Sequence, residues 1–257
     1  MPPSWAILVL AVIQGIAEFL PISSSGHLVI LQSMLGSAKE SASVNILLHA
    51  GTLASILLVY RQRIWDLLRS DRRVIPLLVV GTIPAAVVGI VIKKLFEEIL
   101  SNATLAGAML IVTGAMLLLL PRIRVGESKY QNLSFVGAFL VGCFQAFAIL
   151  PGISRSGSTI LGGRLMGLKD EDSVTFSFLL AIPAILGATV LEVKDLLQEN
   201  IPAQQWVWLI LGAVVAFVVG IVALKWLIRW TEKQQLHRFA YWCIPFGIFV
   251  IVWSLMG

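Results

Sequence analysis

Charged side chains are scarce in this sequence. Only 13% of the 257 residues are Asp, Glu, Lys or Arg, whereas 58% are hydrophobic and the mean hydropathy is +0.91. This balance excludes a water-soluble globular protein and predicts an all-α integral membrane protein with several spans. No charged residue precedes Glu18, and no small-residue cleavage site follows a basic start, so a removable signal peptide is not expected.

Cysteine is almost as rare as charge. Cys143 and Cys243 both lie in apolar runs without metal-ligand spacing, which indicates buried thiols and argues against a Cys/His zinc site. The net charge of +5 comes from basic residues at the ends of apolar segments rather than on one polar face. It therefore predicts orientation in a membrane and no nucleic-acid partner.

One polar stretch interrupts this apolar background. Residues 151–159 read PGISRSGST, which places an arginine and four hydroxyl groups in an apolar region. The Pro-Gly pair should end the preceding helix, and Ser154 or Ser156 should cap a second helix beginning near Ser158. Backbone N–H groups, hydroxyls and the guanidinium of Arg155 would then converge on an anion, best of all a phosphate.

The same design occurs earlier in the chain. Residues 14–27 read QGIAEFLPISSSGH and residues 145–159 read QAFAILPGISRSGST; aligned on their first glutamines, they are offset by 131 residues. The first copy has Glu18 and His27 where the second has an isoleucine and a serine. One copy offers an acid and an imidazole and the other a fixed cation, which predicts an active site divided between two halves.

Each polar stretch is flanked by apolar segments too short to cross a bilayer, so each should form the tip of a re-entrant helical hairpin. Three transmembrane helices should follow each hairpin, because the same offset relates the later apolar segments to the earlier ones. The predicted architecture is one membrane domain, 1–257, with repeat one at 1–120, a linker at 121–131 and repeat two at 132–257. The predicted hairpins are 5–35 and 132–167, and the predicted spans are 44–60, 74–92, 104–120, 173–190, 205–224 and 238–257.

Loop charge predicts the orientation of the two repeats. The connection 61–73 contains five arginines, whereas its counterpart 191–204 is mainly acidic, so equivalent loops should lie on opposite sides of the membrane. This predicts an inverted-topology repeat with 61–73, 121–131 and 225–238 in the cytoplasm and both termini external. The two hairpin tips would then meet near the midplane and form a polar site.

Gln14 and Glu18 have a spacing that places them on one helix face. A carboxylate at that depth requires a partner, and three alternatives are open for Glu18: binding Mg²⁺ or Ca²⁺ with Gln14, acting as a general base, or pairing with Arg155 as structure. His27 follows directly after the serine-rich turn, and an unperturbed imidazole titrates near neutral pH, so we expect it to be catalytic. His49 is interpreted as structural because its neighbourhood in the sequence contains no second catalytic group.

The hydroxyl residues have two interpretations. Ser23, Ser24 and Ser25 are turn formers, but three serines beside His27 also allow a nucleophilic serine and a phosphoserine intermediate; direct attack by water remains the alternative. In the second motif the planar fork of Arg155 suits phosphate oxygens. Ser154, Ser156 and Thr159 are predicted to add hydrogen bonds to the same anion.

Together these motifs resemble the undecaprenyl-diphosphatase family, also called bacitracin-resistance proteins. The resemblance rests on Gln-x-x-x-Glu followed by PISSSGH, on PGISRSGST, and on SFLLAIP from Ser177, and it covers essentially the whole chain. It implies hydrolysis of undecaprenyl diphosphate to the monophosphate and inorganic phosphate with a divalent cation, which recycles the lipid carrier for cell-wall synthesis and confers bacitracin resistance. It also implies a site in the bacterial plasma membrane that opens to the outer face.

The resemblance assigns roles residue by residue. It implies that Glu18, Ser24 and His27 are catalytic and that the second motif, together with Ser23 and Ser25, binds the diphosphate. The chain departs from the family's usual pattern at Gln14, where glutamate is common. The rival interpretation is a transporter or flippase of phosphorylated lipid, because inverted repeats with broken helices are also a transporter architecture. A homodimer is left open.

Overall fold

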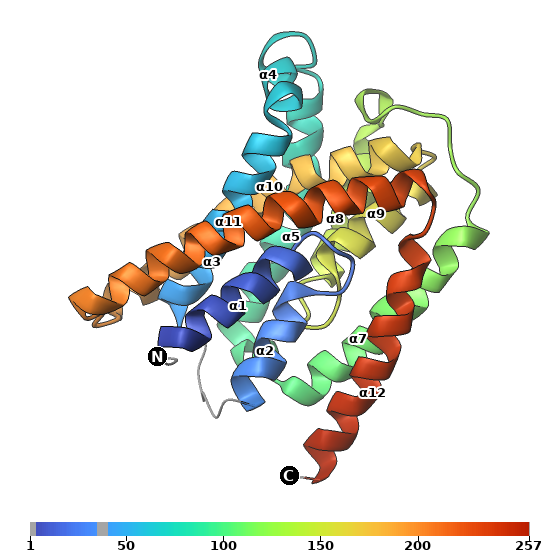
Figure 1. Cartoon of the computed structure of the whole chain (residues 1–257). Helices are drawn as coiled ribbons and strands as arrows, with labels where there is room; N and C mark the ends of the chain where they lie inside the picture. Colours follow the sequence, from blue (N-terminus) through green and yellow to red (C-terminus); the bar gives the residue numbers. More distant parts are fainter. Residues whose placement is uncertain (1–3, 35–40, 257) are drawn as a thin grey trace.

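The computed structural model describes residues 4–34 and 41–256, and it is helical (Figure 1). Within those ranges the only extended pairing is an isolated bridge between Ser128 and Leu168, so the predicted all-α class is confirmed. In chain order the elements are α1 (Ser4–Ala17), α2 (Ser24–Met34), α3 (Ala42–Val59), α4 (Arg61–Arg69), α5 (Val74–Leu95), α6 (Glu97–Leu100), α7 (Ala103–Leu119), η1 (Leu120–Arg122), η2 (Tyr130–Asn132), α8 (Phe135–Phe147), α9 (Arg155–Leu165), α10 (Asp170–Gln198), α11 (Ala203–Glu232), η3 (Leu236–Phe239) and α12 (Ala240–Met256).

Six helical segments are long and apolar enough to cross a bilayer: α3, α5, α7 with η1, α10, α11, and η3 with α12. They correspond to the six predicted spans, which are therefore confirmed. The helices α1, α2, α8 and α9 have 11 to 14 residues, fewer than the roughly 20 that a span needs. The predicted ends at residues 35 and 257 lie outside the described residues.

The short helices form two pairs that pack among the long ones. Helix α1 contacts α2 and α11, whereas α8 contacts α9 and α5. Phe19, which follows α1, is fully buried in an apolar cluster that also contains Ile56, Phe178 and Leu224. The Phe19 and Phe178 ring centroids lie 5.7 Å apart. Apolar packing from three long helices therefore fixes the turn between α1 and α2 inside the molecule.

The connections contain more helix than the sequence predicted. The segment 61–73 was expected to be a loop, but it begins with the helix α4, where the Arg69 guanidinium lies 4.5 Å from the Trp65 ring centroid one turn away. The acidic connection 191–204 is helical as far as Gln198. Just beyond it, the Glu199 carboxylate accepts hydrogen bonds from the first backbone N–H groups of α3, which explains why α10 extends so far. Likewise α11 continues to Glu232.

The basic connections lie together at one end of the molecule. Figure 1 shows α4, the connection from α7 to α8 and the connection from α11 to α12 at the end opposite to the marked N- and C-termini. Acidic residues also occur at this end: Asp170, Glu171 and Asp172 form the first turn of α10, and Asp172 accepts a hydrogen bond from the Tyr130 N–H in the connection from α7 to α8. The three basic connections therefore share one end of the molecule, as expected for a membrane protein.

Candidate active site

The tip of the second hairpin is organised by a serine cap. Helix α8 ends at Phe147, and α9 begins at Arg155 rather than near Ser158 as predicted. The start is earlier because Ser154 is the N-cap, and its hydroxyl accepts a hydrogen bond from the Gly157 N–H at 3.1 Å. Arg155 consequently occupies the first turn of α9. Thr113 of α7 supports this tip, accepting from the Ser154 N–H at 3.0 Å and donating to the Gly152 carbonyl at 2.7 Å.

The first hairpin turns at Ser23, which has a φ of +69°. This conformation is unfavourable for a residue with a side chain and is held by hydrogen bonds. The Ser23 hydroxyl accepts from the Gly26 N–H at 3.3 Å and donates to the Ile153 carbonyl of the other hairpin at 3.2 Å. The two tips also touch directly, because a Cβ atom added at Gly26 would lie only 2.7 Å from the Gly152 Cα atom.

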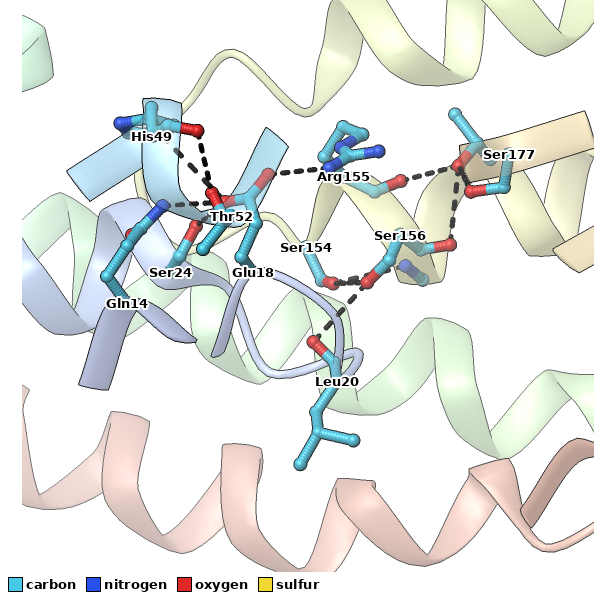
Figure 2. Close-up of polar contacts among 12 residues, drawn as sticks. Gln14, Glu18, Leu20, Ser24, His49, Thr52, Ser154, Arg155, Ser156 and Ser177 are labelled. Carbon is cyan, nitrogen blue, oxygen red and sulfur yellow. Dashed lines mark hydrogen bonds and ion pairs between the residues drawn. The ribbon is translucent and has the colours of Figure 1, made fainter. Parts of the chain in front are cut away.

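Glu18 lies between the two tips and is almost completely buried. Its Oε2 atom accepts hydrogen bonds from the Ser24 hydroxyl at 2.7 Å and from the Gln14 Nε2 atom at 3.1 Å. The His49 Nε2 atom lies 3.9 Å from the same oxygen. Figure 2 shows these three side chains on one side of Glu18 and Arg155 on the other.

Arg155 binds the second oxygen of this carboxylate. Its Nη2 atom lies 2.6 Å from the Glu18 Oε1 atom, which joins the two motifs across 137 positions of the chain. Its Nη1 atom is buried and has no hydrogen-bond partner in the described part of the protein. The guanidinium therefore keeps donors available for a ligand while one of its nitrogens is neutralised by Glu18.

A cavity of about 480 Å³ opens beside this pair. Ser25, His49, Gln145 and Arg155 line its polar part. The walls come largely from α5 and α10 and are mainly apolar, with small residues such as Ala85, Gly89, Ala184, Gly187 and Ala188, although Lys93 and Glu192 also line the cavity. A ligand with an anionic head and an apolar body matches this division.

Sequence comparisons connect this site with known proteins. Residues 7–249 match the family described as bacitracin resistance protein BacA. The undecaprenyl-diphosphatase of Rhodopirellula baltica is 65% identical over 250 residues, covering 97% of each chain. That of Alkaliphilus metalliredigens is 38% identical, covering 97% of this chain and 98% of its own. The chain belongs to the BacA family.

Four of the predicted site residues come together in this member of the BacA family: Gln14, Glu18, Ser24 and Arg155. The ring of His27 points away from them. Its Nδ1 atom lies 2.8 Å from the Ser23 carbonyl oxygen, and its Nε2 atom accepts a hydrogen bond from Trp242 Nε1 at 3.0 Å. The ring also stacks on Phe246 of α12 at a centroid distance of 5.0 Å. Both imidazole nitrogens are thus engaged outside the Glu18–Arg155 pair, and the catalytic role predicted for His27 stays a prediction.

The remaining predicted hydroxyls bond mainly within the protein. Ser156 donates to the Leu20 carbonyl at 3.3 Å, which is a further link between the tips. Thr159 donates to the Arg155 carbonyl at 2.8 Å and lies 2.5 Å from the Ser177 hydroxyl. Ser25 is exposed and lines the cavity. The Ser154 cap and Thr159 thus hold the first turn of α9, and the hydrogen bonds predicted from Ser154, Ser156 and Thr159 to an anion stay a prediction.

The sequence did not predict three residues that lie at this site: His49, Gln145 and Thr113. His49 was interpreted as structural, yet its Nδ1 atom lies 2.9 Å from the Asn45 carbonyl and its Nε2 atom faces Glu18. An ionisable residue inside a predicted span indicates a functional site by itself, and this signal identifies His49. Gln145 served only to align the repeats, and nothing in the sequence distinguished Thr113 within its apolar helix.

The fit of a divalent cation depends on oxygen ligands. Glu18 supplies a carboxylate, and the Gln14 Oε1 atom is buried without a hydrogen-bond partner in the described chain. Turning the Gln14 amide would direct Oε1 toward Glu18 in place of Nε2, at the cost of the hydrogen bond from Nε2 to Glu18. The described residues contain no group of three or more His, Cys, Asp or Glu that could hold a metal ion, so further ligands must come from substrate or water. The side chains that this site could offer a divalent cation are therefore Glu18 and Gln14, and binding of Mg²⁺ or Ca²⁺ stays a prediction.

Proposed function

We propose that this chain hydrolyses undecaprenyl diphosphate to undecaprenyl phosphate and inorganic phosphate in the bacterial plasma membrane, and so recycles a lipid carrier for cell-wall synthesis. Relatives along the full length bear the name undecaprenyl-diphosphatase. The observation that carries the proposal is the joining of Arg155, Glu18 and Ser24 at two hairpin tips beside a cavity with apolar walls. Removal of the terminal phosphate by the same site accounts for bacitracin resistance as a family property.

Arg155 binds the diphosphate. Its unpaired Nη1 atom and its Nη2 atom together form a bidentate fork for phosphate oxygens once a substrate anion competes with Glu18. Glu18 and Gln14 would hold the cation, which would neutralise phosphate charge and polarise the phosphorus–oxygen bonds. The N-terminus of α9, which begins at Arg155, adds a favourable dipole for the same anion.

Ser24 is the group best placed to attack. Its hydroxyl already donates to Glu18, so the carboxylate accepts the proton as the serine oxygen bonds to the terminal phosphorus. The anhydride bond to the bridging oxygen breaks, and the polyprenyl monophosphate leaves. Water then cleaves the phosphoserine, releasing inorganic phosphate and restoring the serine hydroxyl. In the alternative, Glu18 orients a water that attacks the same phosphorus directly.

His27 acts in this proposal by positioning the first hairpin. Its Nδ1–H group donates to the carbonyl of Ser23, the residue with positive φ that directly precedes Ser24. Trp242 and Phe246 fix the imidazole ring from α12. Loss of the ring would therefore release the turn that presents the Ser24 hydroxyl to Glu18.

The polyprenyl tail leaves the cavity sideways, between α5 and α10. Small residues on both helices, Gly89 on α5 and Gly187 on α10 among them, leave room for a hydrocarbon chain beside the polar head. A Cβ atom added at Gly187 would meet no other atom within 4 Å. An exit into the lipid removes the need to bring a long apolar chain into water.

The two halves form an inverted-topology repeat in this proposal. Support comes from helix bounds: the 131-residue offset takes α2 from 24–34 to 155–165, the range of α9. The helix packing supports it too. Helix α1 of the first half packs on α11 of the second, and its counterpart α8 packs on α5 of the first half. Each tip also donates a serine hydrogen bond to a backbone carbonyl of the other, from Ser23 to Ile153 and from Ser156 to Leu20, although the two bonds are not equivalent under the offset.

The positive-inside rule then gives the orientation. The basic end with α4 faces the cytoplasm, both termini are external, and the cavity opens toward the outer face. Every residue of the proposed site comes from one chain, so a homodimer would not be needed to complete it.

Phosphate release from purified protein tests the proposed function against lipid transport. The full chain in detergent, given undecaprenyl diphosphate and Mg²⁺ or Ca²⁺, should release inorganic phosphate over many turnovers. A flippase would bind the lipid and release none. Because detergent removes the two compartments that transport needs, turnover there can only be chemistry.

A further inference from the structure

Gln145 is a buried amide without a partner. It lies in the last turns of α8 with 3% of its surface exposed, and neither Oε1 nor Nε2 has a hydrogen-bond partner in the described part of the chain. Buried side-chain amides are nearly always hydrogen-bonded, because leaving both atoms unpaired opposes folding. An exception beside a ligand cavity indicates that a ligand supplies the missing bonds.

The position of Gln145 identifies that ligand's chemistry. Gln145 lines the same cavity as Arg155, whose Nη1 atom is the other buried donor without a partner there. Two unpaired N–H donors, one cationic and one neutral, thus border a single cavity. Oxygen acceptors carrying negative charge satisfy both donors, whereas an apolar group satisfies neither.

Comparison with Gln14 explains why Gln145 is unpaired. The two glutamines occupy equivalent positions in the two motifs, 131 residues apart. Gln14 donates to Glu18, four residues further along and one helical turn away. The corresponding neighbour of Gln145 is Ile149, which accepts no hydrogen bond. The amide in the second half is therefore free for a ligand, while the one in the first half is committed to the carboxylate.

We propose that Gln145 positions the diphosphate head of the substrate by donating a hydrogen bond from Nε2 to a phosphate oxygen beside Arg155. This inference rests on the proposed function and adds a substrate-positioning residue to it. The amide of Gln145 is neutral and lies on a different helix from Ser24. It should therefore bind the ground state and the transition state about equally. Its removal should therefore raise KM and leave kcat nearly unchanged.

The test compares Gln145→Leu and Gln145→Met with Gln14→Leu in the full-length protein purified in detergent. Thermal unfolding separates a ligand-binding amide from a structural one, because replacing an unpaired buried amide by an apolar side chain removes its desolvation cost. Both Gln145 variants should melt at or above the wild-type temperature. Gln14→Leu, which breaks a hydrogen bond to Glu18, should melt lower and lose kcat.

Kinetics and ligand protection complete the test. With farnesyl diphosphate as a short soluble substrate, the Gln145 variants should show a KM raised about tenfold and kcat within about threefold of wild type. Inorganic pyrophosphate should raise the melting temperature of wild type and raise that of the Gln145 variants less. An unchanged KM with equal protection by pyrophosphate would overturn the inference, and so would a fall in melting temperature as large as that of Gln14→Leu.

The two proposals fail in different ways. If wild-type protein releases no phosphate from either polyprenyl diphosphate, the hydrolase proposal fails, and protection by pyrophosphate still decides whether Gln145 binds the anion. If wild type turns over and the Gln145 variants match it in KM and in protection, only the assignment of Gln145 fails.

Discussion

Glu18 divides its two carboxylate oxygens between two groups of partners. Oε1 faces the Arg155 guanidinium, whereas Oε2 receives Ser24 and Gln14 and lies 3.9 Å from His49. A buried carboxylate is stable only when such partners replace its lost hydration. The same residue thus links the fixed cation of one hairpin to the nucleophile candidate of the other.

Changing Glu18 or Gln14 should alter the response to cations. Glu18→Gln removes the only carboxylate that contacts Arg155 among the described residues and should weaken or abolish the dependence on divalent cation, together with most activity. Gln14→Glu places a second carboxylate one turn away, so it should be tolerated and bind the cation more tightly. Phosphate release measured against Mg²⁺ and Ca²⁺ concentration tests both, and an unaltered cation response in Glu18→Gln would remove Glu18 from the cation site.

His27 should be needed for turnover but not for binding. His27→Ala removes the hydrogen bond to Ser23 and the contacts to α12, yet leaves Arg155 and α9 in place. We expect phosphate release to fall by at least about a hundredfold, while protection against thermal unfolding by pyrophosphate persists. His49→Gln is the matched comparison, since His49 lies on the Glu18 side of the site. A His27→Ala protein with wild-type turnover would show that the ring has no part in the reaction.

At the scale of the element, the two broken helices could be predicted because Pro, Gly and Ser cluster in apolar surroundings. Helix ends were less accurate: Ser154 caps α9 directly, so Arg155 lies in the first turn and not before it. Helix α4 was missed because the arginines of 61–73 were interpreted only as loop charge, although Ile64, Leu67 and Leu68 have helical spacing and Leu67 is buried. The extension of α10 to Gln198 depends on a contact with α3 that no local pattern contains.

Contact between the hairpin tips is a packing requirement that a single methyl group should violate. In Gly26→Ala the new Cβ atom would lie 2.7 Å from Gly152 Cα and 2.8 Å from Gly152 N, both backbone atoms of the other tip. We expect destabilisation of about 1–3 kcal/mol and reduced turnover, because the tips must separate. Gly187→Ala, in an open part of α10, is the control and should not lower the melting temperature. Equal melting temperatures for the two variants would mean that the tips are not tightly packed.

For the whole molecule, the spans and the meeting of the two hairpin tips could be predicted from one internal repeat, and pairing with Arg155 was one of three alternatives for Glu18. The roles of the individual site residues could not be predicted, because they depend on rotamers and on which helices enclose the cavity. His27 was favoured for its position beside Ser25, but its ring meets Trp242, which is 215 residues distant in the chain. His49 and Gln145 reach the cavity only through the packing of α3 and α8, which sequence spacing does not determine.

The proposed orientation predicts the sidedness of single cysteines. In a background lacking Cys143 and Cys243, cysteines replace Ser70 at the end of α4 and Gln198 at the end of α10, both exposed positions. A membrane-impermeant maleimide added to intact cells should label the Gln198→Cys protein, and the Ser70→Cys protein only after permeabilisation. Labelling of both from the same side would contradict the inverted repeat.

The most direct test of a hydrolytic site divided between the hairpins is phosphate release by Arg155→Lys. Lysine can keep the charge beside Glu18, but it is a point charge and cannot give two parallel hydrogen bonds to phosphate. We predict a loss of turnover of at least about a hundredfold, in protein that still inserts, purifies and melts near the wild-type temperature. Near-normal phosphate release from undecaprenyl diphosphate would contradict the account, because Arg155 would then be only a structural counter-ion for Glu18.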